Sequence, residues 1–315
     1  MMVMVELKNL SKRYRSLFKN RDILAVDSIN LQVQKGEILG LLGPNGAGKT
    51  TIIKLICGLL KPTQGSVFIE GWEVERHRKR ILPKLGAVLE GTRNFHWPLT
   101  IKENLSYFGS LKNLRGKGLK KNVDHLLQFF DLQEKANVQA RLLSQGMKQK
   151  LSVALALISD PVLLLLDEPT SNLDVKSSRS LQEKIKELAQ KDGKTVIITT
   201  HNMEVAQEIC DRIAIINRGK IVASDRVENL IGLFSEQRYE LKLENYFHWE
   251  KLQGLTFIKE LQFQSGNDCN TLTFTLKETS GLYDIMDLLR REEVIIEAIN
   301  KKEASLEDIF LSLTK

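Results

Sequence analysis

The strongest constraint on the fold is the stretch Gly43-Pro44-Asn45-Gly46-Ala47-Gly48-Lys49-Thr50, which matches the phosphate-binding pattern G-x-x-x-x-G-K-[ST] at every fixed position. It follows the short apolar run 37–42, which reads as a strand. It precedes residues 51–60, in which apolar side chains recur at helical spacing. Strand, loop and helix therefore stand in the order that the pattern requires, and they predict a layered α/β fold.

The chemistry of this loop follows from its position between a strand and a helix. Its backbone N–H groups and the helix N-terminus point at one place, where the oxygens of a polyphosphate can accept them. Lys49 adds a positive charge for the outer phosphates, and Thr50 offers a hydroxyl to the accompanying Mg²⁺. The predicted nucleotide-binding residues are Gly43, Pro44, Asn45, Gly46, Ala47, Gly48, Lys49, Thr50 and Thr51. An ordinary glycine-rich turn before a helix is the alternative.

An acidic pair, Asp167-Glu168, ends the aliphatic run 162–166. The run is apolar on both faces, as a central parallel strand should be, so it delivers two carboxylates to the edge of the sheet where loops converge. We expect Asp167 to hold Mg²⁺ through its hydration shell and Glu168 to polarise a water for in-line attack on the terminal phosphate. A surface acidic pair is the alternative, but the preceding residues are too apolar for an edge strand.

Two further segments carry candidate site residues. Ser144-Gln145-Gly146-Met147 opens a helical stretch, where Ser144 is a good N-cap and Gly146 permits close approach of another backbone. This helix start is either a second anion site or simply a well-capped helix. His201 follows the predicted strand 195–198. A neutral imidazole there could bond a phosphate oxygen or orient water, or it could be a polar residue that closes the strand.

The spacing of apolar residues and turns elsewhere in residues 1–237 predicts the strands and helices around these segments. Alternating residues predict half-buried antiparallel strands at 3–7 and 29–33, with Tyr14 in a basic connection between them. Tyr14 is a candidate platform for a flat ring, or a packed surface aromatic. Residues 100–159 are helical in period and form an insert between strands, and Asn217-Arg218-Gly219 marks a hairpin.

Near residues 235–237 a second series of predicted strands and helices begins. Strands are expected at 239–243, 272–276 and 294–299, with helices at 282–291 and after the cap 305–308. The prediction is a nucleotide-binding domain over 1–237, with a helical insert at about 91–160, and a small α+β domain over 238–315. The second domain contains no recognisable catalytic constellation.

Composition excludes several classes of protein. Of 315 residues, 42% are hydrophobic and 27% charged, which is ordinary for a folded soluble chain. No apolar run approaches the roughly 20 residues of a membrane-spanning helix, and the short polar N-terminus does not look like a secretion signal, so a cytoplasmic location is expected. The net charge of +7 is modest. The basic runs 76–80 and 112–121 are either solvated faces or surfaces near lipid head groups.

Taken together, these motifs resemble the ATP-binding subunit of an ABC transporter over about residues 1–230. Gly43 to Thr50 resembles the Walker A loop, and Asp167-Glu168 ends a Walker B strand with its catalytic glutamate. Residues 143–147 resemble the family signature, usually LSGGQ, with Gln145 and Met147 as departures, and residues 171–174 resemble the D-loop. His201 and Tyr14 fall at the switch-histidine and adenine-stacking positions.

The resemblance implies an α/β P-loop NTPase fold with an antiparallel β subdomain and a helical insert. It also implies a head-to-tail dimer over two ATP molecules, in which Ser144 and Gly146 of one copy touch the terminal phosphate held by the other. A homodimer or a paired ATP-binding subunit fits equally. The implied location is peripheral, at the cytoplasmic face of the membrane, with a separate permease docked near residues 89–105 and no nucleic acid as partner.

Two details refine the resemblance. Glu90 stands where the family usually has a glutamine that contacts metal and water, so the expected metal set is Thr50, Glu90 and Asp167. The C-terminal segment 304–311 resembles the accessory tail of the export branch. Two other classes stay open, a soluble ABC-type ATPase acting on nucleic acid or ribosomes and a regulatory module without turnover. The presence of Lys49, Glu168 and His201 argues against the second.

Overall fold

The computed structural model describes residues 2–15, 22–90, 94–234, 237–245, 247–266, 270–277 and 280–302, together with 306, 309 and 310. The chain divides into two compact units, residues 1–227 and 228–315, and each is described by itself. The boundary expected between residues 237 and 238 falls just inside a strand of the second unit. Except for Leu306, the expected cap at 305–308 lies outside the described residues, and so does Cys269.

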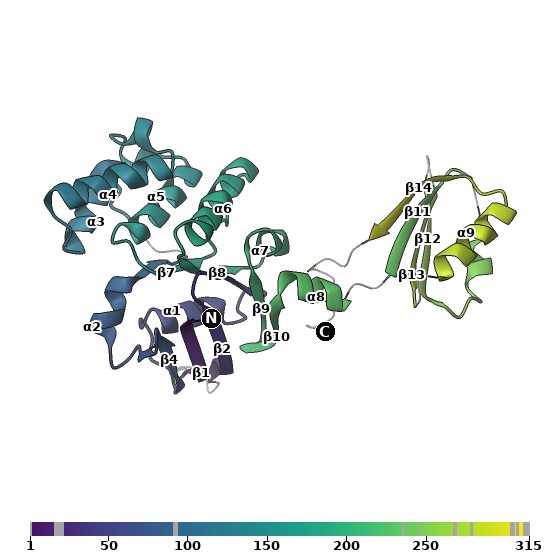
Figure 1. The fold of residues 1–315 in the computed structure, drawn as a ribbon, viewed down its shortest axis with the longest axis horizontal. Helices are drawn as coiled ribbons and strands as arrows, with labels where there is room; N and C mark the ends of the chain where they lie inside the picture. Colours follow the sequence, from purple (N-terminus) through teal and green to yellow (C-terminus); the bar gives the residue numbers. More distant parts are fainter. Residues whose placement is uncertain are drawn as a thin grey trace. The chain divides into compact units, whose positions relative to one another are not determined.

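A six-stranded sheet forms the centre of the first unit (Figure 1). Its strands are β3 (Ile38–Leu42), β6 (Leu85–Val88), β7 (Leu163–Asp167), β8 (Thr195–Thr200), β9 (Arg212–Asn217) and β10 (Lys220–Arg226). The order is β10-β9-β3-β8-β7-β6, with β10 antiparallel to β9 and the other pairs parallel. The hairpin expected at residues 217–219 is therefore confirmed. All five residues of β7 are buried between β8 and β6, as the aliphatic run predicted.

An antiparallel sheet covers one side of this centre. It contains β1 (Val3–Tyr14), β2 (Ile23–Gln34), β4 (Gln64–Ile69) and β5 (Trp72–Glu73), in the order β2-β1-β4-β5. The prediction that Tyr14 lies in a connection is wrong, because β1 continues to Tyr14, which pairs with Ile23. Register shifts along β1 let this basic segment stay in the ladder without strict alternation.

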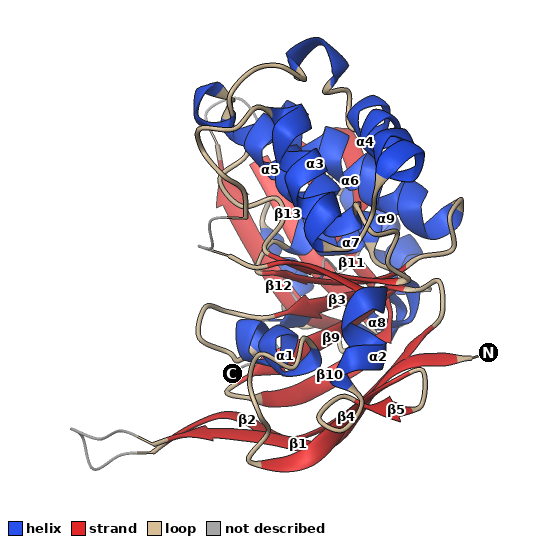
Figure 2. Ribbon diagram, turned by 90° about the vertical axis from the view of Figure 1, so that its left-hand side faces the viewer, coloured by secondary structure: helices blue, strands red, loops and turns tan. Residues whose placement is uncertain are grey.

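Helix α1 (Lys49–Ile56) lies between the two sheets (Figure 2). Its apolar residues share one core with both sheets, which explains the helical spacing seen in the sequence. The helix is shorter than the expected 51–60. It ends before Gly58, whose φ of 65° is left-handed and stops a helix at low cost.

The helices that follow β6 in the first unit cover the other face of the central sheet (Figure 2). They are α3 (Ile101–Leu111), α4 (Gly116–Phe129), α5 (Gln145–Leu157), α6 (Val175–Gln190) and α7 (Met203–Ile209). Shorter pieces are α2 (Arg78–Ile81) and the 3₁₀ turns Leu82–Lys84, Gln133–Lys135 and Ala140–Leu142. Thr100 and Glu103 form a capping box at the start of α3, where the helical period of the sequence begins.

The second unit is a four-stranded antiparallel sheet with a helix packed on it. Its strands are β11 (Gln237–Leu243), β12 (Ile258–Ser265), β13 (Asn270–Leu276) and β14 (Ile296–Lys302), in the order β12-β13-β11-β14. Helix α8 (Val227–Phe234) begins where the units divide, followed by the 3₁₀ turn Trp249–Leu252 and α9 (Gly281–Arg291). Leu241, Phe274 and Ile285 belong to one core. The sequence analysis missed β12, an edge strand with mostly exposed positions.

Candidate active site

The phosphate-binding loop is held in shape by close packing of its glycines. At Gly43 a Cβ atom would lie 2.3 Å from the carbonyl oxygen of Ile216, and at Gly48 it would lie 2.3 Å from that of Ala25. Gly48 also has a φ of 108°, which a residue with a side chain rarely adopts. The exposed residues of the loop are Pro44, Asn45 and Gly46, so its tip is open to solvent.

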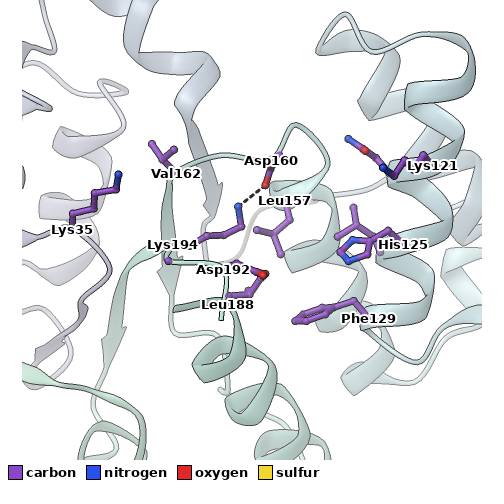
Figure 3. Close-up of a pocket in the computed structure, with 13 residues that line it drawn as sticks. Lys35, Lys121, His125, Phe129, Leu157, Asp160, Val162, Leu188, Asp192 and Lys194 are labelled. Carbon is purple, nitrogen blue, oxygen red and sulfur yellow. Dashed lines mark hydrogen bonds and ion pairs between the residues drawn. The ribbon is translucent and has the colours of Figure 1, made fainter. Parts of the chain in front are cut away.

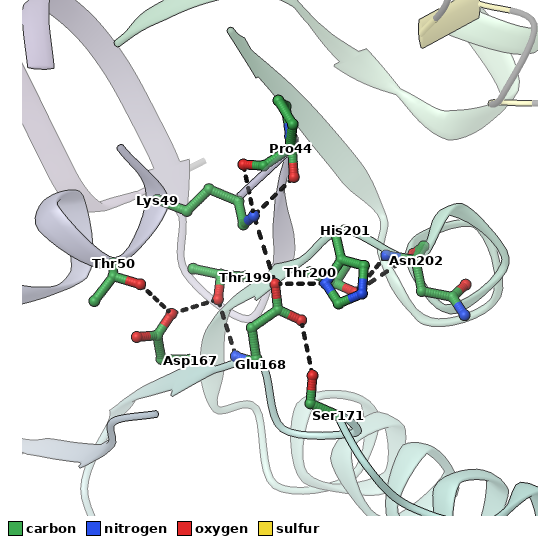
Figure 4. A network of polar contacts seen from close by, with 11 residues as sticks. Pro44, Lys49, Thr50, Asp167, Glu168, Ser171, Thr199, Thr200, His201 and Asn202 are labelled. Carbon is green, nitrogen blue, oxygen red and sulfur yellow. Dashed lines mark hydrogen bonds and ion pairs between the residues drawn. The ribbon is translucent and has the colours of Figure 1, made fainter. Parts of the chain in front are cut away.

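Lys49 is buried at the base of the loop. Its Nζ donates to the carbonyl oxygens of Gly43 at 2.7 Å and Pro44 at 3.2 Å. The same atom lies 3.5 Å from Oε1 of Glu168, and both side chains are only 7% exposed. The positive charge is therefore compensated within the chain (Figure 4).

Asp167 lies at the end of β7, beside the start of α1. Its Oδ1 accepts hydrogen bonds from the hydroxyls of Thr50 at 3.2 Å and Thr199 at 2.6 Å. Its Oδ2 is buried and has no hydrogen-bond partner among the described residues. An unsatisfied buried carboxylate oxygen beside a hydroxyl is a donor set that suits a hard cation such as Mg²⁺.

The described residues contain no group of three or more His, Cys, Asp or Glu side chains placed to hold a metal ion by themselves. This is compatible with Mg²⁺, which keeps several waters and is usually bound through one or two carboxylates together with substrate phosphates. Thr50 and Asp167 therefore fit the metal. Glu90 is exposed, and in the part of the chain that the structure describes no hydrogen bond or ion pair joins it to them.

Glu168 is fixed from several directions, and its φ of 50° lies in the left-handed region. Its N–H donates to Oγ1 of Thr199 at 2.9 Å, and its Oε2 accepts from the hydroxyl of Ser171 at 3.5 Å. Its Oε1 accepts from Nδ1 of His201 at 3.1 Å. One carboxylate oxygen thus faces both Lys49 and His201 (Figure 4).

The sheet topology explains why these residues meet. Strands β3, β8 and β7 are parallel neighbours, so their C-terminal ends lie side by side. The loop follows β3, the acidic pair ends β7, and His201 follows β8. The sequence analysis assigned no role to Thr199 or Ser171. The signal available for Thr199 was its place two residues before His201 at the end of a buried strand.

Tyr14 lies near the start of α1 rather than in the acidic cluster. Its hydroxyl is 3.5 Å from Oγ1 of Thr51, and Nζ of Lys12 lies 5.5 Å from the centre of its ring. The side chain is 38% exposed, so one side of the ring is available to a ligand. This position fits an aromatic platform beside the phosphate-binding loop.

Ser144 and Gly146 are at the start of α5. Ser144 is exposed and accepts a hydrogen bond from the N–H of Met147 at 3.3 Å, which confirms it as the N-cap. Gly146 is buried, and a Cβ atom there would lie 2.5 Å from Oγ of Ser177 in α6. Among the described residues no hydrogen bond or ion pair links Ser144 or Gly146 to the cluster around Asp167.

The cysteines play no part in the cluster. Cys57 and Cys210 are buried free thiols. Burial raises the pKa of Cys57 to about 12, with Asp167 contributing, and burial also raises the pKa of Cys210. Both thiols therefore stay protonated and unreactive at neutral pH.

Comparisons with known proteins agree with this geometry. Residues 26–171 match the family model described as ABC transporter. The chain is 34% identical to the ABC transporter ATP-binding protein NatA of Bacillus subtilis (strain 168), over 79% of this chain and 98% of that protein. It is 36% identical to the Nod factor export ATP-binding protein I of Cupriavidus metallidurans, over 100% of this chain and 98% of that protein.

A solved structure that is similar to this chain is also an ATP-binding cassette. It is described as an ATP-binding cassette, dimeric and in a post-hydrolysis state bound to ADP and Pi. The two chains share 30% identity with a TM-score of 0.65, over 71% of this chain and 99% of that one. Within the described residues no helix is both long and apolar enough to cross a membrane. The chain belongs to the ABC transporter family, as an ATP-binding subunit with the P-loop NTPase fold whose members hydrolyse ATP.

Proposed function

We propose that this subunit hydrolyses ATP in a head-to-tail dimer and thereby drives export through a separate membrane permease. The observation that carries the proposal is the cluster at the ends of β3, β7 and β8. There Lys49, Asp167 and Glu168 are buried together, and one oxygen of Asp167 lacks a partner. A carboxylate, a lysine and a hard-cation position beside a phosphate-binding loop are the parts that phosphoryl transfer needs.

Lys49 changes partners when ATP binds. In the structure its ammonium group contacts two loop carbonyl oxygens and Glu168. Phosphate oxygens of ATP carry more negative charge than the carbonyls and compete for the ammonium group. The exchange frees Oε1 of Glu168 from Lys49 while leaving its contact with His201 in place. Nucleotide binding and activation of the carboxylate are therefore coupled through one lysine.

Thr50 and Asp167 would hold Mg²⁺ together with the phosphates, and the bound ion would supply positive charge opposite the transferred group. Glu168 directly follows Asp167 at the end of β7, orients the attacking water and accepts its proton. His201 donates to Glu168 and keeps the carboxylate aimed. Tyr14 stacks on the adenine, and the loop residues from Gly43 to Thr51 surround the phosphates.

The second half of each site comes from another copy of the chain. Ser144 is exposed at the start of α5, so its hydroxyl can meet phosphate held by a partner, and the buried Gly146 holds the same turn close to α6. The similar cassette that was solved as a dimer supports this arrangement. Glu90 has no such support in the geometry, and its place in the metal set rests on its sequence position alone.

Separate observations support a permease as the partner and export as the direction of transport. The helical insert displays Trp97, 39% exposed, and Tyr107, 44% exposed, near the segment that the resemblance assigns to permease docking. We place the subunit at the cytoplasmic face of the membrane, bound to that permease. Export is supported by the Nod factor export protein, which matches the chain along its whole length, including the C-terminal unit.

The partner is tested by affinity purification of the tagged full-length chain from detergent-solubilised membranes. We expect a multi-spanning membrane protein to co-purify, and we expect Trp97→Asp to lose it. Tyr283→Asp is the control, since Tyr283 is also an exposed aromatic residue, 74% exposed, but lies in the C-terminal unit. Recovery of ribosomes or RNA alone would instead favour a soluble ATPase acting on nucleic acid.

A further inference from the structure

A sizeable cavity lies away from the phosphate-binding loop. It has a volume of about 640 Å³ and is walled on one side by α4 of the helical insert (Figure 3). The opposite wall consists of the turn between α6 and β8, with the turn before β3 at one end. The volume is within the range of pockets that hold drug-sized organic molecules.

The floor of the cavity is apolar. Leu126 and Leu157 of the insert and Leu188 of α6 are buried beneath it. Phe129 stacks on His125 with ring centres 6.1 Å apart, and Nζ of Lys184 covers Phe129 at 4.8 Å. A compact apolar group seated here loses contact with water without displacing protein.

One charged pair inside the cavity is already satisfied. Nζ of Lys194 is 2.5 Å from Oδ1 of Asp160 and donates to the carbonyl oxygen of Pro161 at 2.9 Å. The lysine side chain is 12% exposed, so it is fixed rather than free to follow a ligand. This pair contributes no net charge to the site.

The rim of the cavity, unlike the Lys194–Asp160 pair, carries a net charge. Lys35 lies at one end of the cavity and Lys121 at the other in Figure 3, and neither forms an ion pair among the residues described. Asp192 is the opposing carboxylate. Two free ammonium groups against one carboxylate leave the rim positive.

We propose that this cavity binds a small organic anion, a carboxylate or phosphate joined to a compact apolar body. The anion contacts the lysines of the rim and the apolar body fills the floor. Because the walls come from the insert and from the core, the bound ligand joins them and restrains the insert, which also carries Ser144. The site lies outside the ATP-hydrolysing cluster and goes beyond the proposed function.

Binding is tested on the full-length chain without nucleotide, using octyl phosphate below its micelle concentration and isothermal titration calorimetry. We expect saturation at one site per chain, with weaker binding of octanol and of inorganic phosphate. Lys121→Glu should weaken octyl phosphate by about threefold to tenfold, and Asp192→Lys should strengthen it by a similar factor. Both residues are exposed and outside the catalytic cluster, so ATP binding should be unchanged.

The matched control is Lys112→Glu, an exposed lysine of the same insert that does not line the cavity. No saturable binding, equal binding of octanol, or equal weakening by Lys112→Glu would overturn the proposal. Opposite effects of the two rim variants cannot come from misfolding. Hydrogen exchange with octyl phosphate should protect both residues 121–129 and residues 188–194, and protection of one segment alone would overturn the bridging role. Neither experiment uses ATP hydrolysis, so the outcome is independent of the proposed function.

Discussion

The phosphate-binding loop and the start of α5 both present a helix N-terminus, but their polar groups are satisfied in different ways. At α1 the N-cap is Gly48 and no side chain caps the helix, whereas at α5 the hydroxyl of Ser144 does so. Lys49 at the start of α1 is buried and paired with Glu168, while Ser144 at the start of α5 is exposed. At α1 no side chain satisfies the first N–H groups, whereas at α5 the hydroxyl of Ser144 satisfies one of them, the N–H of Met147.

This difference indicates a division of labour within one chain. Uncapped N–H groups at α1 can be satisfied by phosphate, so the loop retains ATP by itself. The capped start of α5 is a rigid surface whose hydroxyl makes further contacts only when something approaches it from outside. Substitutions at the phosphate-binding loop should therefore alter ATP hydrolysis or Mg²⁺ use in every copy that carries them. Substitutions at the start of α5 should affect only the contact between two copies of the chain.

The largest effect is expected from Glu168→Gln. The amide keeps the size of the side chain but cannot accept the proton of the attacking water, so turnover should fall by about 10²- to 10⁴-fold. ATP affinity should persist, because Lys49 still meets the phosphates, and an ATP-bound dimer should accumulate. Phosphate release and size-exclusion chromatography with ATP measure the two effects.

Glu183→Gln is the control for this change, because it alters an exposed carboxylate on α6. It should leave turnover and dimerisation as they are. Wild-type turnover in Glu168→Gln would contradict the role given to Glu168.

A smaller effect is expected from Thr199→Val. The hydroxyl of Thr199 donates to Asp167 and accepts from the N–H of Glu168, so its loss leaves both groups without that partner. Residues that orient a metal ligand typically change metal affinity by about 10- to 100-fold. The Mg²⁺ concentration for half-maximal ATPase activity should rise accordingly. Thr199→Ser restores the hydroxyl and should restore the wild-type value; an unchanged Mg²⁺ dependence in Thr199→Val would remove Thr199 from this role.

The contrast between Thr199 and Lys49 shows how far sequence reasoning reaches. Lys49, Thr50, Asp167 and Glu168 were found because each belongs to a contiguous pattern whose chemistry is local. Thr199 was missed because its role depends on β8 pairing with β7, which aligns it with Asp167 across the sheet. The fold class was predictable from the alternation of strands and helices, whereas Tyr14 in β1 depends on register shifts that no local pattern reveals.

At the start of α5, mixed dimers give a test in which the rate of ATP hydrolysis should change about twofold. A dimer with Ser144→Ala in one copy should lose hydrolysis at one of two sites, and its rate should fall to about half if the sites act independently. Ser144→Asn supplies another good N-cap and tests whether the loss comes from the contact or from fraying of α5. Full activity of the mixed dimer would show that Ser144 does not act on the partner's nucleotide.

The smallest effect concerns Asp174, which caps α6 beside Gly146. It accepts from the N–H of Ser177 at 2.9 Å and from its hydroxyl at 2.7 Å, and these bonds lower the pKa of Asp174 below its ordinary 3.8. A carboxylate whose pKa is lower in the folded state stabilises the fold above the unfolded pKa, and this stabilisation is lost as the pH falls through the folded value.

Asp174→Asn keeps an N-cap acceptor but cannot titrate. Above about pH 4 the wild type should therefore have the higher Tm, and the difference should shrink as the pH falls further, because only the wild type loses a charged cap. Thermal unfolding of both proteins between pH 6 and pH 2.5 measures this. Parallel Tm curves would mean that the cap on α6 contributes no pH-dependent stability, and the packing of Ser177 against Gly146 would then be independent of the charge on Asp174.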